Sequence, residues 1–116
     1  MFNLKIDKED FWIDLPLGVR FHVKAATPAI MLGARYKVSS SVKDGDGFGE
    51  ITSEMIASVA QLAVFEWDGV GDSQGNALEC TPENVHAVLS SSWQIAEEFD
   101  KKYLSKFYEI ELEKNV

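Results

Sequence analysis

The stretch FWIDLPLGVRFHVKAATPAI, residues 11 to 30, changes from a strand pattern to a helix start and so decides the fold class. VRFHVKA at 19 to 25 alternates apolar with polar residues, the period of a half-buried strand. FWIDL at 11 to 15 is a second strand candidate, and the Pro/Gly turn at 16 to 18 joins the two into a predicted β-hairpin. Thr27-Pro28 then places a capping side chain before a proline at the first helical position.

The spacing of apolar residues also predicts strands and helices in the rest of the chain. A further strand is predicted where Phe2, Leu4 and Ile6 alternate with polar residues. The other predicted elements are a helix at 27 to 38, a mobile glycine-rich loop at 39 to 50, a helix at 52 to 65, a helix that opens at Thr81-Pro82, and a final amphipathic helix from 92 to about 114.

We therefore predict an α+β fold in a single domain spanning residues 1–116. Residues 1–26 would form a β-hairpin or small antiparallel sheet. Residues 27–116 would be mainly helical, with about four helices, of which the last is long and amphipathic.

Composition narrows the class of protein. The formal charge of −8 disfavours binding to nucleic acid or to an anionic membrane surface. Cys80 is the only cysteine, which suits a reducing compartment, and early charges exclude a signal-peptide core. No apolar stretch approaches the roughly 20 residues of a membrane span. These features predict a cytoplasmic protein.

EWDGVGDSQGNALECTPENVHAVL, at 66 to 89, holds the densest cluster of Asp, Asn and Gly. As a calcium loop it has Glu79 twelfth from Asp68, but Val70 stands at the third position, where a side-chain oxygen is needed. As a phosphate loop it lacks a Lys or Arg and carries Asp72, which repels anions. The composition is that of a turn, placed here between two helices, and we predict neither a metal nor a cofactor.

His22, His86 and Cys80 are the remaining candidates for catalysis or zinc binding. A Cys–His pair requires closeness in space that spacing cannot show, and three residues without a recognised spacing do not make a zinc motif. Separate structural roles are the favoured interpretation, and we predict that the protein is not an enzyme.

The apolar stripe of the final helix includes Phe99, Tyr103 and Phe107, preceded by Trp93. Such a stripe is most often part of a core. Because the helix is amphipathic to its end, part of the stripe could instead contact another protein, and these four residues are the predicted contacts.

The second half of the sequence resembles the tail assembly chaperones of long-tailed bacteriophages and prophages. The shared pattern is an apolar helix, a W-[DE]-G-V-x-D turn, a T-P-E helix start and a final amphipathic helix. LPLGVRFHVKAATPAIMLGARYKV, at 15 to 38, is similar to the hairpin and first helix of those proteins. The residues that match the loop motif are Trp67, Asp68, Gly69, Val70, Asp72, Gly75, Thr81, Pro82 and Glu83.

The resemblance implies a non-enzymatic function. Such chaperones keep the long helical tape-measure protein soluble and bring tail-tube protein to it. They tend to self-associate, and many are made in two lengths by a programmed frameshift. The alternatives are a small structural tail or connector component of the virion, an acidic protein-binding adaptor, or, from another class, a small hydrolase or metal-dependent enzyme that uses Cys80, His22 or His86.

Overall fold

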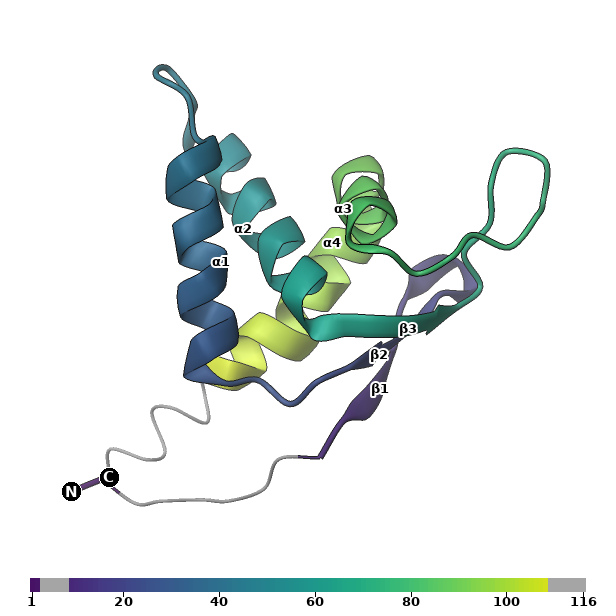
Figure 1. Cartoon of the computed structure of the whole chain (residues 1–116), viewed down its shortest axis with the longest axis horizontal. Coiled ribbons are helices and arrows are strands. Elements are labelled where there is room, and N and C mark those ends of the chain that lie inside the picture. The colour runs from purple at the N-terminus through teal and green to yellow at the C-terminus, as the bar shows by residue number, and fades with distance from the viewer. Residues whose placement is uncertain (3–8, 109–116) are drawn as a thin grey trace.

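The computed structural model describes residues 1–2 and 9–108 and has the predicted α+β fold (Figure 1). Its sheet has three antiparallel strands in the order β1-β2-β3. The helices α1 to α4 make up most of the rest. The predicted strand at 2 to 6 falls largely on residues outside the described ranges.

The predicted hairpin is confirmed. β1 (Phe11–Asp14) pairs with β2 (Arg20–Val23), with Trp12 opposite His22 and Ile13 opposite Phe21. A short 3-10 turn, η1 (Pro16–Gly18), joins the strands. The alternation found in the sequence places Ile13, Phe21 and Val23 in the core, and Trp12 and His22 on the opposite face.

The third strand, β3 (Val64–Asp68), corrects the sequence interpretation. We expected the preceding helix to reach residue 65 and the following residues to be a turn between two helices. Instead α2 (Phe48–Ala63) ends two residues earlier and the chain pairs with β2, with Val64 opposite Val23 and Trp67 opposite Phe21. The glycine-rich segment therefore links a strand to a helix.

The loop predicted at 39 to 50 is shorter than expected, because α1 (Pro28–Ser41) and α2 extend into it from both sides. The hydroxyls of Ser39 and Ser40 donate to the carbonyl of Tyr36, and that of Ser41 donates to the carbonyl of Lys37. Serines that bond to the preceding turn remain compatible with a helix. The connection is reduced to residues 42–47.

The Thr-Pro helix starts are confirmed by their hydrogen bonds. Thr27 Oγ1 accepts from the Ile30 amide at 3.3 Å, and Thr81 Oγ1 accepts from the Asn84 amide at 3.2 Å, where α3 (Pro82–Ser91) begins. Ser92 caps the next helix, α4 (Trp93–Phe99), in the same way.

The last helix does not stay regular. After α4 the chain passes into a π-helical segment, η2 (Asp100–Leu104), and is helical again at 105–108. The wider turn brings Leu104 into the core beside Tyr103. The expected continuation to residue 114 lies outside the described residues.

A single apolar cluster joins the inner face of the sheet to the helices. Phe21 of β2 meets the ring of Phe99 edge-on, with 5.9 Å between centroids, and Phe99 stacks on Tyr103 at 5.2 Å. The Tyr103 hydroxyl donates to the carbonyl of Lys24 at 2.8 Å, which fixes the last helix to the end of β2.

Candidate functional site

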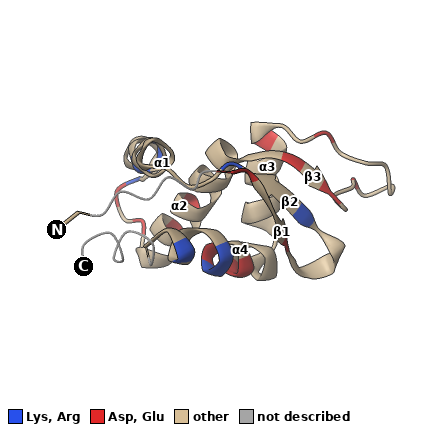
Figure 2. Cartoon of the chain, turned by 90° about the horizontal axis from the view of Figure 1, so that it is seen from below, with Lys and Arg blue, Asp and Glu red and all other residues tan. Residues whose placement is uncertain are grey.

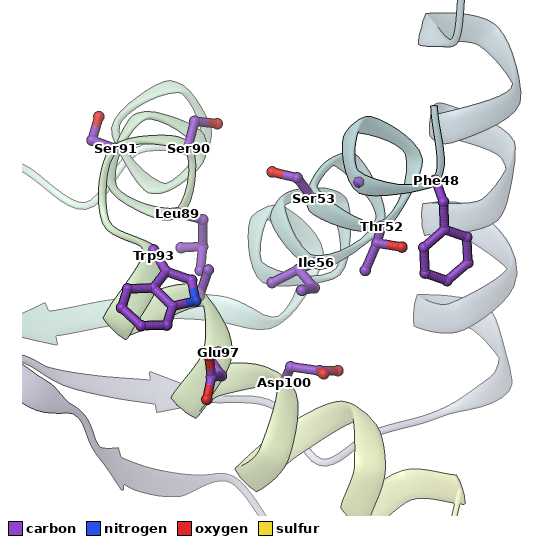
Figure 3. Close-up of a pocket in the computed structure, with 12 residues that line it drawn as sticks. Phe48, Thr52, Ser53, Ile56, Leu89, Ser90, Ser91, Trp93, Glu97 and Asp100 are labelled. Atoms are coloured by element: carbon purple, nitrogen blue, oxygen red, sulfur yellow. The ribbon is translucent and has the colours of Figure 1, made fainter. Parts of the chain in front are cut away.

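The candidate site is a groove where the start of α2, the end of α3 and one face of α4 come together (Figure 3). It is open to solvent and has a volume of about 520 Å³. Its lining residues are Phe48, Gly49, Thr52, Ser53, Ile56, Leu89, Ser90, Ser91, Trp93, Ala96, Glu97 and Asp100. They come from segments about 40 residues apart in the sequence.

Two exposed aromatic side chains flank the groove on opposite sides, as Figure 3 shows. Phe48 is the first residue of α2, and 86% of it is exposed. Trp93 is the first residue of α4, and 76% of it is exposed. Each is the first residue of its helix and remains largely accessible to solvent.

The floor of the groove is apolar. Ile56 of α2 and Leu89 of α3 are buried, and Ala96 of α4 is small and half-buried. Ala96 follows Trp93 by three residues, so both lie on one helix face. The lining also includes the hydroxyl residues Thr52, Ser53, Ser90 and Ser91.

The α4 side of the groove is acidic. Glu97 and Asp100 continue the face that carries Trp93, at four and seven residues from it. Burial raises the pKa of the Asp100 carboxyl, and the neighbouring Glu97 carboxylate raises it further. The Glu97 carboxylate itself lies 3.5 Å from the Lys101 ammonium, in an exposed pair.

The predicted contact residues separate into two groups. Trp93 lies on the surface at the groove. Phe99, Tyr103 and Phe107 are core residues, exposed by 0%, 2% and 9%. Their rings are committed to the fold, so the expectation that they form a contact surface is corrected, and only Trp93 is available to a partner. Phe48 is not among the predicted contacts, because it follows glycines within the predicted loop at 39 to 50.

The motif loop begins with two residues that hold it against the sheet. Trp67 donates from Nε1 to the Leu78 carbonyl at 2.9 Å and stacks on Phe21. Gly69 has φ of +82° and lies against the backbone of Gly18 so closely that a Cβ would overlap the Gly18 carbonyl oxygen. The Trp and first Gly of the motif therefore have structural roles.

The rest of the loop is a hairpin-like extension, closed by an isolated bridge between Gly71 and Ala77 (Figure 1). Asp72 Oδ1 accepts from the amides of Gln74 and Asn76, each at 2.9 Å. These bonds lower the pKa of Asp72. The tight turn ends at Gly75, with φ of +83°.

The other motif residues also serve the fold. Val70 packs against the core, and Asp68 ends β3 opposite Arg20 on the exposed face. Thr81 and Pro82 start α3. We assign the motif loop to shaping the chain between β3 and α3, and none of its residues lines the groove.

His22 belongs to a stack on the open face of the sheet. Its ring lies 4.6 Å from that of Trp12 and 4.4 Å from that of Phe65, and the Arg20 guanidinium lies over the Trp12 ring, 4.8 Å from its centroid. The His22 ring thus contacts one aromatic ring from each neighbouring strand region, Trp12 of β1 and Phe65 of β3. Cross-strand contacts of this kind stabilise a sheet.

His86 lies in a row with Glu54 and Ser90. Its Nε2 is 3.1 Å from the Glu54 carboxylate, and its Nδ1 is 3.3 Å from Ser90 Oγ. The residue types are those of a nucleophilic triad, but Ser90 lies in the last turn of α3, where the negative end of the helix dipole would repel an oxyanion. We assign the row to holding α3 against α2.

The remaining candidate, Cys80, is half-buried, and burial raises the pKa of its thiol, as does Glu66. A raised pKa disfavours the reactive thiolate. Within residues 1–2 and 9–108, no three His, Cys, Asp or Glu side chains are grouped so that they could hold a metal ion. In the same ranges, no helix combines the length and apolar character that crossing a bilayer requires.

Comparisons with known proteins identified no relative of this chain. A scan against protein-family models found no match, and neither did searches of curated proteins and of solved structures.

Proposed function

We propose that this protein is a non-enzymatic tail assembly chaperone that holds an apolar helical segment of a tape-measure protein in the groove between α2, α3 and α4. The observation that carries the proposal is the pair of exposed aromatic side chains, Phe48 and Trp93, on either side of an apolar floor. The class of partner comes from the sequence resemblance. Delivery of tail-tube protein and self-association, which the resemblance also implies, are part of the proposal.

The energetics favour a helix as the bound element. A helix in a groove presents apolar side chains every three or four residues, and these would meet Ile56, Leu89 and Ala96. Full burial of a large apolar side chain contributes about 1.5–3 kcal/mol. Because Trp93 and Phe48 are largely exposed in the free protein, most of this free energy would be released when a partner covers them.

The acidic surface fits the same function. A chaperone for an apolar chain must remain soluble with its client bound, and a net charge of −8 favours solubility.

The test is co-expression with helical fragments of the tape-measure protein from the same genome. With the wild-type chain, the fragment should stay in the soluble fraction and co-elute in gel filtration. Trp93→Ser and Phe48→Ser should each move most of it to the pellet.

The matched control is Tyr36→Ser on α1. Tyr36 is 75% exposed but does not line the groove, so this change should leave the fragment soluble. Equal loss with Tyr36→Ser, or no loss with either groove variant, would show that the groove is not the binding site.

A second measurement separates the chaperone from a structural tail component. Mass spectrometry of purified phage particles should not detect the chain, because a chaperone leaves before the tail is complete. Stoichiometric copies in the particle would favour the virion component instead.

A further inference from the structure

The groove carries one feature that an apolar helix alone would not need, the half-buried carboxyl of Asp100. Asp100 is the first residue of η2, and Figure 3 shows its side chain at the lower end of the groove, below Ile56. In the unbound protein this position makes the ionised carboxylate less favourable. It loses solvent and faces a second carboxylate, Glu97.

The nearby cations are engaged elsewhere. The Lys101 ammonium lies 3.5 Å from Glu97. The Lys102 ammonium donates to the Asp14 carbonyl at 2.6 Å and lies 3.5 Å from Glu98. Within the part of the chain that the structure describes, no ion pair or side-chain hydrogen bond involves the Asp100 carboxylate. The Asp100 carboxylate is thus the group of the acidic side that is left for a cation from outside.

The spacing of the lining residues fixes where that cation would lie. Trp93 and Asp100 are seven residues apart, two turns along the same helix face. At 1.5 Å per residue the apolar and acidic ends of the groove are separated by roughly 10 Å. A second helix lying along the groove covers the same distance in two of its own turns.

Building on the proposed function, we propose that the groove selects an amphipathic helix with a Lys or Arg on its apolar face, two turns from the apolar residues that meet Trp93, and that Asp100 pairs with this cation. Glu97 adds to the negative potential without pairing directly. The apolar segment held in the groove therefore carries one cation among its apolar residues.

Fluorescence anisotropy with two labelled 20-residue helical peptides of identical composition tests this. The first has two central leucines and a Lys two turns to either side on the same face, so that the direction of binding does not matter. In the second, both lysines are moved to the opposite face. At low salt we expect the first to bind wild-type protein roughly five- to tenfold tighter, about 1–1.4 kcal/mol.

Asp100→Asn should remove this preference and leave the affinity for the second peptide unchanged. Since the lone carboxylate is unfavourable in the free fold, the same change should also raise the melting temperature. Glu83→Gln, which removes an exposed carboxylate at the far end of α3, is the matched control and should keep the preference.

The outcomes separate this inference from the function on which it rests. Equal binding of the two peptides, or a preference that survives Asp100→Asn, overturns the role of Asp100 while the groove remains a helix site. Failure of both peptides to bind wild-type protein overturns the helix groove and this inference with it.

Discussion

At the scale of single residues, Gly69 shows what the loop motif requires. It follows β3 directly and meets the backbone of Gly18 in the turn between β1 and β2. A Cβ would overlap the Gly18 carbonyl oxygen and lie 3.0 Å from its carbonyl carbon. Gly75 has almost the same φ but no atom within 4 Å of an added Cβ. Comparing the two glycines therefore distinguishes the effect of a close backbone contact, present only at Gly69, from the effect of a positive φ, present at both.

Gly69→Ala should destabilise the fold by about 3 kcal/mol or more, because backbone at both ends of the contact must move. Gly75→Ala should cost only the strain of a left-handed alanine, about 1–2 kcal/mol. Urea unfolding of the two variants measures both values. Equal costs would mean that the contact with Gly18 is not required.

Asp72 gives a prediction about pH. Its carboxylate accepts two loop amides, and these bonds depress its pKa in the folded protein. Because the pKa is depressed on folding, the stability that the ionised carboxylate adds is fully present above the unfolded pKa of about 4. That stability is lost as the pH falls through the lower pKa of the folded protein. The amide proton shifts of Gln74 and Asn76 should therefore hold from pH 7 to about 4 and change below it.

Asp72→Asn is the control for that titration, since its side-chain oxygen can still accept the amides without ionising. Its Gln74 and Asn76 shifts should stay constant over the same acidic range. A wild-type transition centred above pH 4 would contradict the stabilised carboxylate.

At the scale of elements, local chemistry predicted most of the fold. The alternation in β1 and β2 and the Thr-Pro starts of α1 and α3 each depend on residues within a few positions of one another. β3 was missed because its residues also continue the apolar pattern of α2. Only pairing with β2, about 45 residues away, makes Val64 a strand residue.

The groove was harder to predict for the same reason. Trp93 was identified as a contact because it precedes an amphipathic helix. Phe48 becomes its counterpart only when α2 and α4 are placed side by side. The division of the final stripe into core residues and one surface residue likewise depends on the sheet, whose Phe21 covers Phe99.

The last helix therefore predicts unequal costs for two aromatic substitutions. Phe99→Ala should destabilise by about 3–5 kcal/mol, because Phe99 is fully buried between Phe21 and Tyr103. Trp93→Ser should change stability by no more than about 0.5 kcal/mol, because most of its ring faces solvent. Thermal melts of the two variants measure this difference. A large loss with Trp93→Ser would assign that residue to the core as well.

At the scale of the whole molecule, the surface carries a net negative charge. Figure 2 shows acidic residues along β3 and α4, with basic residues on β2 and at the end of the last helix. Several ion pairs between side chains are exposed, as in Arg20 with Asp14 and Lys101 with Glu97. Such pairs contribute about 0–1 kcal/mol each. Repulsion among the excess carboxylates, 19 acidic against 11 basic residues, acts against them.

Screening that repulsion should stabilise the free protein. Between about 10 and about 300 mM sodium chloride, the Debye length falls from about 30 Å to below about 8 Å, so the long-range repulsion fades before the close pairs do. We expect the melting temperature to rise by about 2–4 °C, the equivalent of less than about 1 kcal/mol for a domain of this size. Potassium chloride should act equally, since the effect is one of ionic strength. A melting temperature that falls with salt would mean that attraction within the exposed ion pairs exceeds the repulsion among the excess carboxylates.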